Sequence, residues 1–153
     1  MTAKYTEATT YSNVVTTELN SLADDTAALA GTALSNDAST ERQLLGNFVI
    51  NLASYTPGDT NGVSLLIVPD DGAGTFPTTD SLATAENYIA RYADGTAATF
   101  TSDTTAGAFV HVATGIQLPN ANYKVGLLNH SGAALAASGN TIQASGTYSV
   151  DDV

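Results

Sequence analysis

The sequence contains no cysteine, no tryptophan and only four basic residues. Without cysteine, the chain forms no disulfide bonds, performs no thiolate chemistry and holds no metal through sulfur. Nucleic-acid binding draws on several phosphate contacts from lysine and arginine. Four basic residues against 15 acidic ones, a formal net charge of −11, therefore predict a protein that binds neither nucleic acid nor an acidic membrane surface.

Long apolar segments are also missing from the sequence. No apolar run approaches the roughly 20 residues of a membrane-spanning helix. The first ten residues, MTAKYTEATT, lack the apolar region of a secretory signal peptide. We therefore expect a protein made in the cytoplasm and without a membrane partner. Its 153 residues are 43% hydrophobic, which is enough for one domain with one sizeable core.

Strand-like alternation is the main pattern that is present. Residues 42–54, RQLLGNFVINLAS, place hydrophobic side chains at every second position, which is typical of a half-buried β-strand. We expect four large residues to share the buried face: Leu44, Phe48, Ile50 and Leu52. The alternate positions, from Gln43 to Asn51, form the more polar face.

Further strands are expected at 63–69, 106–119, 120–132 and 140–150, joined by short segments rich in Gly, Asn and Ser. The loop 55–62 contains Pro-Gly and Asn-Gly pairs, which punctuate strands.

Two segments have weaker patterns. Residues 18–37 predict a short helical turn or loop, followed by a strand that ends at the Asn36–Asp37 turn. Residues 80–94 fit either a helix or a strand, and we favour a turn leading into a strand near 87–93. Asp94–Gly95 then predicts a further turn.

Strands that recur about every 10 to 15 residues without regular helices predict the all-β class. We expect a single-domain antiparallel β-sandwich over residues 18–153, preceded by an extended N-terminal arm over residues 1–17. The arm has too little apolar surface to fold alone, so we expect a neighbouring subunit to order it. Its interface candidates, since interfaces are enriched in tyrosine, are Tyr5, Tyr11, Val14 and Val15.

The most conspicuous candidate site is the Asp70-Asp71-Gly72 sequence, which directly follows an apolar strand. A calcium loop needs six to eight converging oxygens at alternating positions, and this spacing does not supply them. A strand-ending turn has a simple mechanism, because Asp accepts hydrogen bonds from the backbone ahead and Gly adopts a positive φ. We therefore predict a turn and no metal site.

The other polar candidates have ordinary structural interpretations. Asp24–Asp25 and Asp151–Asp152 are expected to be solvated charges, His111 to lie on a sheet face, and His130 to be a turn residue. The sequence alone cannot refute a Ser-His-Asp triad, but it contains no Gly-x-Ser-x-Gly elbow, Walker loop, dinucleotide fingerprint or His-Glu-x-x-His motif. We predict no catalytic residues and no cofactor.

Residues 116–150 resemble the C-terminal part of a group of small virion proteins from tailed bacteriophages. The resemblance rests on a Leu-Pro corner, a strand with an aromatic and a basic residue, the turn NHSGAAL, and the closing strand TIQASGTYSV. LNSLA at 19–23, the strand containing FVINL and the Asp-Gly turn occur in the same order upstream. The chain departs from the pattern at 69–80, where an aromatic residue often follows the glycine more closely.

This resemblance implies a jelly-roll-like β-sandwich that decorates or cements the outside of a phage capsid. Its partner is then the major capsid protein, and it assembles as a homotrimer at threefold or quasi-threefold positions of the head. The expected location is the capsid surface of the virion. Three alternatives stay open: a tail or fibre component, a carbohydrate-binding β-sandwich, and a hydrolase.

Overall fold

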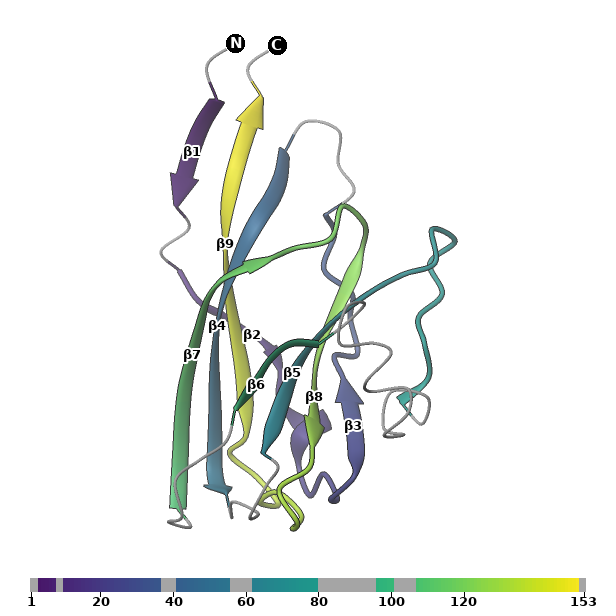
Figure 1. Ribbon diagram of the computed structural model, residues 1–153, viewed down its shortest axis with the longest axis vertical. Helices are drawn as coiled ribbons and strands as arrows, with labels where there is room; N and C mark the ends of the chain where they lie inside the picture. Colours follow the sequence, from purple (N-terminus) through teal and green to yellow (C-terminus); the bar gives the residue numbers. More distant parts are fainter. Residues whose placement is uncertain are drawn as a thin grey trace.

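The computed structural model describes residues 3–7, 10–36, 41–55, 62–79, 96–100 and 107–151. Side chains are described for 10–36, 43–55, 62–79 and 107–146. These described residues form two antiparallel β-sheets that pack face to face (Figure 1). The predicted all-β sandwich is therefore confirmed.

The larger sheet, sheet A, has the strand order β1-β9-β4-β7, and β2 also pairs with β9. Its strands are β1 (Ala3–Glu7), β2 (Ser12–Val15), β4 (Glu41–Tyr55), β7 (Gly107–Gln117) and β9 (Thr141–Asp151). Sheet B has the order β3-β8-β5-β6. Its strands are β3 (Thr26–Leu29), β5 (Val63–Pro69), β6 (Thr96–Phe100) and β8 (Tyr123–Asn129). A single 3₁₀ turn, η1 (Thr17–Leu19), lies between β2 and β3.

The strands pair from the outside of the sequence inward. β1 and β2 pair with β9, β3 pairs with β8, β4 pairs with β7, and β5 pairs with β6, all antiparallel. If β1 and β2 count as one interrupted strand, this nesting of eight strands over two sheets is the arrangement of a jelly roll. The chain thus folds as a long hairpin wound into a sandwich.

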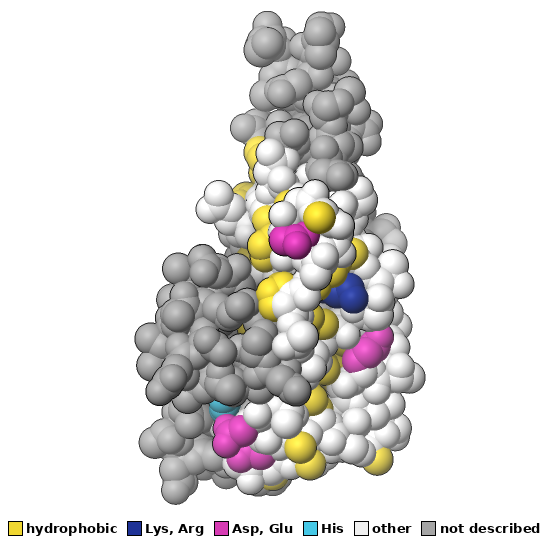
Figure 2. Space-filling model, turned by 90° about the vertical axis from the view of Figure 1, so that its right-hand side faces the viewer, with side chains coloured by type: hydrophobic (Ala, Val, Ile, Leu, Met, Phe, Trp, Pro, Cys, Tyr) yellow, Lys and Arg dark blue, Asp and Glu magenta, His cyan; other side chains and the backbone are white. Residues whose placement is uncertain are grey.

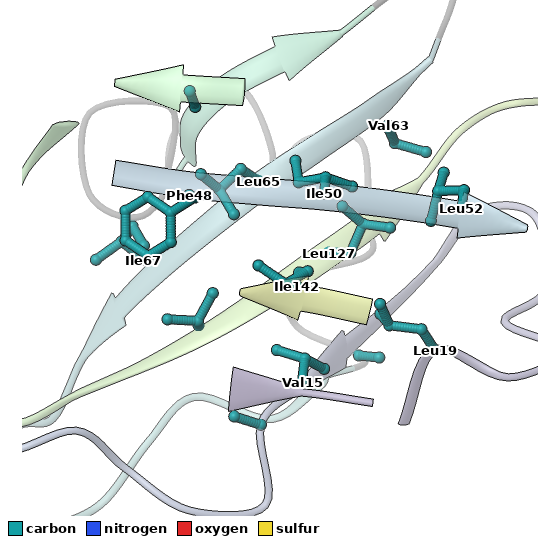
Figure 3. Packing of buried hydrophobic residues seen from close by; sticks show 14 of the residues in the cluster. Val15, Leu19, Phe48, Ile50, Leu52, Val63, Leu65, Ile67, Leu127 and Ile142 are labelled. Carbon is teal, nitrogen blue, oxygen red and sulfur yellow. The ribbon is translucent and has the colours of Figure 1, made fainter. Parts of the chain in front are cut away.

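The core lies between the sheets and is built by alternation on sheet A and by continuous burial on sheet B. Phe48, Ile50 and Leu52 of β4 point inward and meet Leu65 and Leu127 of sheet B (Figure 3). β5 is buried on both faces, and its second face contributes to a smaller cluster of Ala27, Leu66, Val68 and Leu128. The outer face of sheet A, in contrast, carries exposed side chains.

The prediction for Leu44 was wrong. Its side chain is 47% exposed, because a register shift between Gln43 and Leu45 inserts an extra residue opposite β9. A bulge of this kind interrupts the strict alternation on which the prediction depended. Gln43, expected on the polar face, instead accepts a hydrogen bond from the Tyr123 hydroxyl at 3.4 Å.

Four of the predicted strands, 63–69, 106–119, 120–132 and 140–150, match β5, β7, β8 and β9. In 18–37 the turn is present as η1, but strand β3 ends at Leu29 rather than at Asn36–Asp37. β6 was not predicted. The expected strand at 87–93 and the Asp94–Gly95 turn lie outside the described residues.

The N-terminal segment is extended, as predicted, but it pairs within its own chain. β1 and β2 both run antiparallel to β9. Val15 is 1% exposed in the core, and Val14 packs against the same cluster. Two of the four proposed interface residues therefore contact the protein's own core. The ordering of the arm by a neighbouring subunit stays a prediction.

Candidate functional site

The Asp70-Asp71-Gly72 segment is a strand-ending turn, as predicted. Asp70 Oδ1 accepts a hydrogen bond from the Gly72 N–H at 3.2 Å, and Gly72 has a φ of +83°. Asp71 Oδ1 accepts hydrogen bonds from the N–H groups of Ala73 at 2.8 Å and Thr75 at 3.0 Å. These backbone hydrogen bonds hold the pKa of the Asp71 carboxyl below its ordinary value. Both carboxylates thus stabilise their own turn by accepting hydrogen bonds from its backbone N–H groups.

A second group of polar side chains joins two loops at one end of the sandwich. Asp25 Oδ1 lies 2.8 Å from His130 Nδ1, and Asp24 Oδ1 accepts a hydrogen bond from the Gly132 N–H at 2.8 Å. On the face of the molecule drawn in Figure 2, a histidine lies beside acidic side chains near the lower end. The two aspartates, expected to be only solvated, therefore also fasten the turn after β8, where His130 lies as predicted.

The Asp25–His130 pair is not part of a nucleophilic triad with its neighbour Ser131. Ser131 is 2% exposed, and its hydroxyl donates to the Ala133 carbonyl at 3.0 Å. His111 lies on β7 of the other sheet, stacked on Phe109 at a centroid distance of 6.0 Å, where burial lowers its pKa. Within the part of the chain described, no three His, Asp or Glu side chains form a group that could hold a metal ion.

Three buried asparagines tie the loops to the sandwich, a feature that sequence reasoning missed. Asn129 donates to the carbonyls of Leu22 and Ala133 and accepts from the Ser131 N–H. Asn36 and Asn140 make equivalent sets of hydrogen bonds with backbone groups of other loops and strands. Each side chain bonds both to backbone groups nearby in the sequence and to at least one that is 83 or more positions away, so these asparagines are structural.

The strongest candidate for a functional surface is the outer face of sheet A, here called the neutral face. It is defined by Leu45, Val49 and Asn51 on β4, Val110 and Val112 on β7, and Gln143 on β9. Val110 is 66% exposed and Val112 51% exposed, and Leu45 is also exposed. Val112 lies opposite Val49 in the sheet register, and Val110 lies opposite Asn51. The neutral face therefore combines exposed apolar side chains with amides.

Charge is absent from this face although the chain is strongly acidic. Residues 43–55, 107–117 and 141–150 contain no Asp, Glu, Lys or Arg. The charged residues of the sheet A strands lie toward one end of the sheet, where Ala3 pairs with Asp151 and Lys4 and Glu41 both pair with Val150. Exposed apolar side chains that gather on a surface without charge resemble the centre of a protein interface, which is depleted in charged residues.

A cavity of about 220 Å³ opens between the sheets beside the β4 bulge. Gln43, Tyr123 and Ser145 supply polar groups to its wall, and Phe48 and Leu34 supply apolar ones. The described residues that line it carry no charge.

The proposed interface tyrosines are in different positions. Tyr11 is 37% exposed just before β2. Tyr5 lies on β1 opposite Ser149 of β9. Neither belongs to the neutral face, which sequence reasoning did not identify, although the long uncharged stretches of the sequence were a usable signal.

Comparisons with family models, with curated proteins and with solved structures find no match to this chain. Among the described residues, no helix is long and apolar enough to cross a membrane.

Proposed function

We propose that this protein is a structural virion protein of a tailed phage, which binds the major capsid protein on the outside of the head and stabilises the shell. The observation that carries the proposal is the neutral face. A surface of valines, leucines and amides without charge suits a protein partner, because interfaces are depleted in charged residues at their centre. The jelly-roll strand order is also the architecture that the resemblance of residues 116–150 implies.

The mechanism is mechanical and needs no chemistry. Each copy contributes modest contacts through a face that is uncharged. Contacts that are weak one at a time sum when an assembly engages several sites on the shell at once. The acidic loops elsewhere keep the decorated particle soluble and repel free DNA.

Binding to isolated heads tests this function. Heads are prepared from the phage that encodes the chain, with the gene deleted, and are sedimented with purified protein. We expect the wild-type protein to sediment with the heads. Leu45→Glu places a carboxylate on the neutral face and should weaken binding at least about tenfold, because the charge is desolvated without a partner.

Ala73→Glu is the matched control, since it adds the same charge on the exposed turn after β5 and should bind as the wild type does. Equal binding by the two variants would remove the neutral face from the capsid contact. A wild-type protein that ignores heads but binds tails or fibres would replace the head assignment with the tail assignment.

A further inference from the structure

β7 is an edge strand of sheet A, and within residues 107–117 it carries neither charge nor proline. A strand at the edge of a sheet offers unpaired N–H and C=O groups, which proteins shield with charges, prolines or short strands. The other described edges follow this rule: β1 carries Lys4 and Glu7, β3 has 4 residues, and β6 has 5. β7 has 11 residues without charge or proline. In Figure 1, β7 lies at the left margin of the lower half of the sandwich.

The regular part of this edge is short and apolar on its outer side. A register shift against β4, together with Gly115 at a φ of +69°, interrupts the strand after Ala113. Before that point, Phe109 and Ala113 contact the core, so Val110 and Val112 must point outward. Their side chains are the two most exposed large hydrophobic ones in the described chain.

Charge decides which partner suits this edge. Two copies, each with a net charge of −11, repel one another through most orientations. An approach through β7 brings no carboxylate of the regular sheet A strands near the contact, because 43–55 and 107–117 carry none. Among the described strands of sheet A, this edge is therefore one along which a second copy can approach without bringing carboxylates together.

We infer that two copies of this chain pair through β7, antiparallel about a twofold axis close to His111, so that the two A sheets become one continuous sheet. A centre at His111 places each Val110 opposite Val112 of the second copy. The four valines then form one apolar strip on the outer side, and such cross-strand pairs of β-branched residues are favourable. The two β7 strands then lie side by side in the geometry of an antiparallel pair.

The pairing does not depend on capsid binding, but it adds to the proposed function. Joining two A sheets presents the neutral face twice on one rigid body, which raises the strength of attachment through avidity. A twofold pair also differs from the homotrimer that the resemblance implies, so the mass of the assembly separates the two.

Sedimentation velocity of the full-length protein at about 50 µM tests the inference. We expect a particle of twice the 15.6 kDa chain mass. Val110→Glu/Val112→Glu places four carboxylates across the axis and should weaken pairing at least about 100-fold, leaving monomers. The matched control, Ala73→Glu/Ala134→Glu, adds two carboxylates on exposed loop residues and should leave the pair intact. Far-UV circular dichroism verifies that both variants are folded.

A disulfide test locates the contact even if the glutamate variant fails to fold. The chain has no cysteine, so His111→Cys creates a single thiol that the twofold axis brings against its counterpart, within the Cα separation of roughly 4.4–6.8 Å that a disulfide spans. Oxidation should yield a cross-linked dimer, whereas Ala73→Cys should not cross-link. A wild-type monomer or trimer at this concentration, an intact pair in the Val110→Glu/Val112→Glu variant, or failure of His111→Cys to cross-link would each overturn the inference. Head binding is measured separately, so either proposal can fail alone.

Discussion

Replacing Asn129 tests whether buried asparagines hold the loops of the sandwich. Asn129 is fully buried. Its Nδ2 donates to the carbonyls of Leu22 at 3.0 Å and Ala133 at 2.8 Å, and its Oδ1 accepts from the Ser131 N–H at 3.1 Å. Asn129→Ala removes all three hydrogen bonds.

The size of the expected loss in stability depends on which hydrogen bonds the three partner groups retain. The Leu22 carbonyl still accepts from the Leu135 N–H, and the Ala133 carbonyl still accepts from the Ser131 hydroxyl. The Ser131 N–H loses its described acceptor, Asn129 Oδ1. Three lost hydrogen bonds at about 1 kcal/mol each, with one group left unsatisfied, give a loss of about 3 to 5 kcal/mol in the free energy of unfolding. The melting temperature should fall by about 6 to 15 °C.

Asn129→Asp separates this cause from simple cavity formation. The carboxylate keeps the acceptor for the Ser131 N–H but turns its second oxygen toward two carbonyls. Burial and these carbonyls favour the protonated form, so the pKa of the new carboxyl lies above its unfolded value. The folded state then binds more protons, and the variant regains stability as the pH falls through that raised pKa.

Urea unfolding of both variants at several pH values measures these effects. Asn13→Ala, at an exposed position of β2, is the control and should change stability by less than about 0.5 kcal/mol. A loss below 1 kcal/mol in Asn129→Ala, or an Asn129→Asp variant whose deficit does not shrink at lower pH, would refute the reasoning.

Two further changes test other parts of the fold. Gly126→Ala should destabilise the protein by several kcal/mol in urea unfolding, because a Cβ at this position meets the backbone carbonyl of Ala28 on the paired strand β3; stability within 1 kcal/mol of the wild type would contradict that contact. Burial alone would raise the pKa of Glu18. Hydrogen bonds from backbone N–H groups, including those of Thr16 and Gly31, outweigh this effect, so the pKa lies below its ordinary value. The folded state therefore binds fewer protons than the unfolded chain, and stability from Glu18 is lost as the pH falls below about 4; Glu18→Gln should make stability fall less steeply there, and an unchanged slope would count against it.

Features encoded locally could be predicted from the sequence. The Asp70-Asp71-Gly72 turn depends on side chains that accept hydrogen bonds from backbone groups two to four residues ahead. The identity of three adjacent residues was therefore enough to predict the turn. Phe48, Ile50 and Leu52 were placed correctly in the core because strand alternation is also local.

Features set by distant partners could not be predicted in this way. The bulge that exposes Leu44 arises from the register between β4 and β9, about a hundred positions away in sequence. Asn129 reaches Leu22 across a separation of 107 residues. The neutral face becomes visible only when β4, β7 and β9 are placed side by side, although each of the three segments is visibly free of charge.

Cryo-electron microscopy of whole particles is the most direct test of our proposal that this protein decorates the outside of a phage head. Maps of particles with and without the gene are compared at equal resolution. We expect density of the size of this sandwich on the outer surface of the head, with sheet A toward the capsid, present only when the gene is intact. Identical heads in both maps, with the protein located on the tail or missing from the particle, would contradict it.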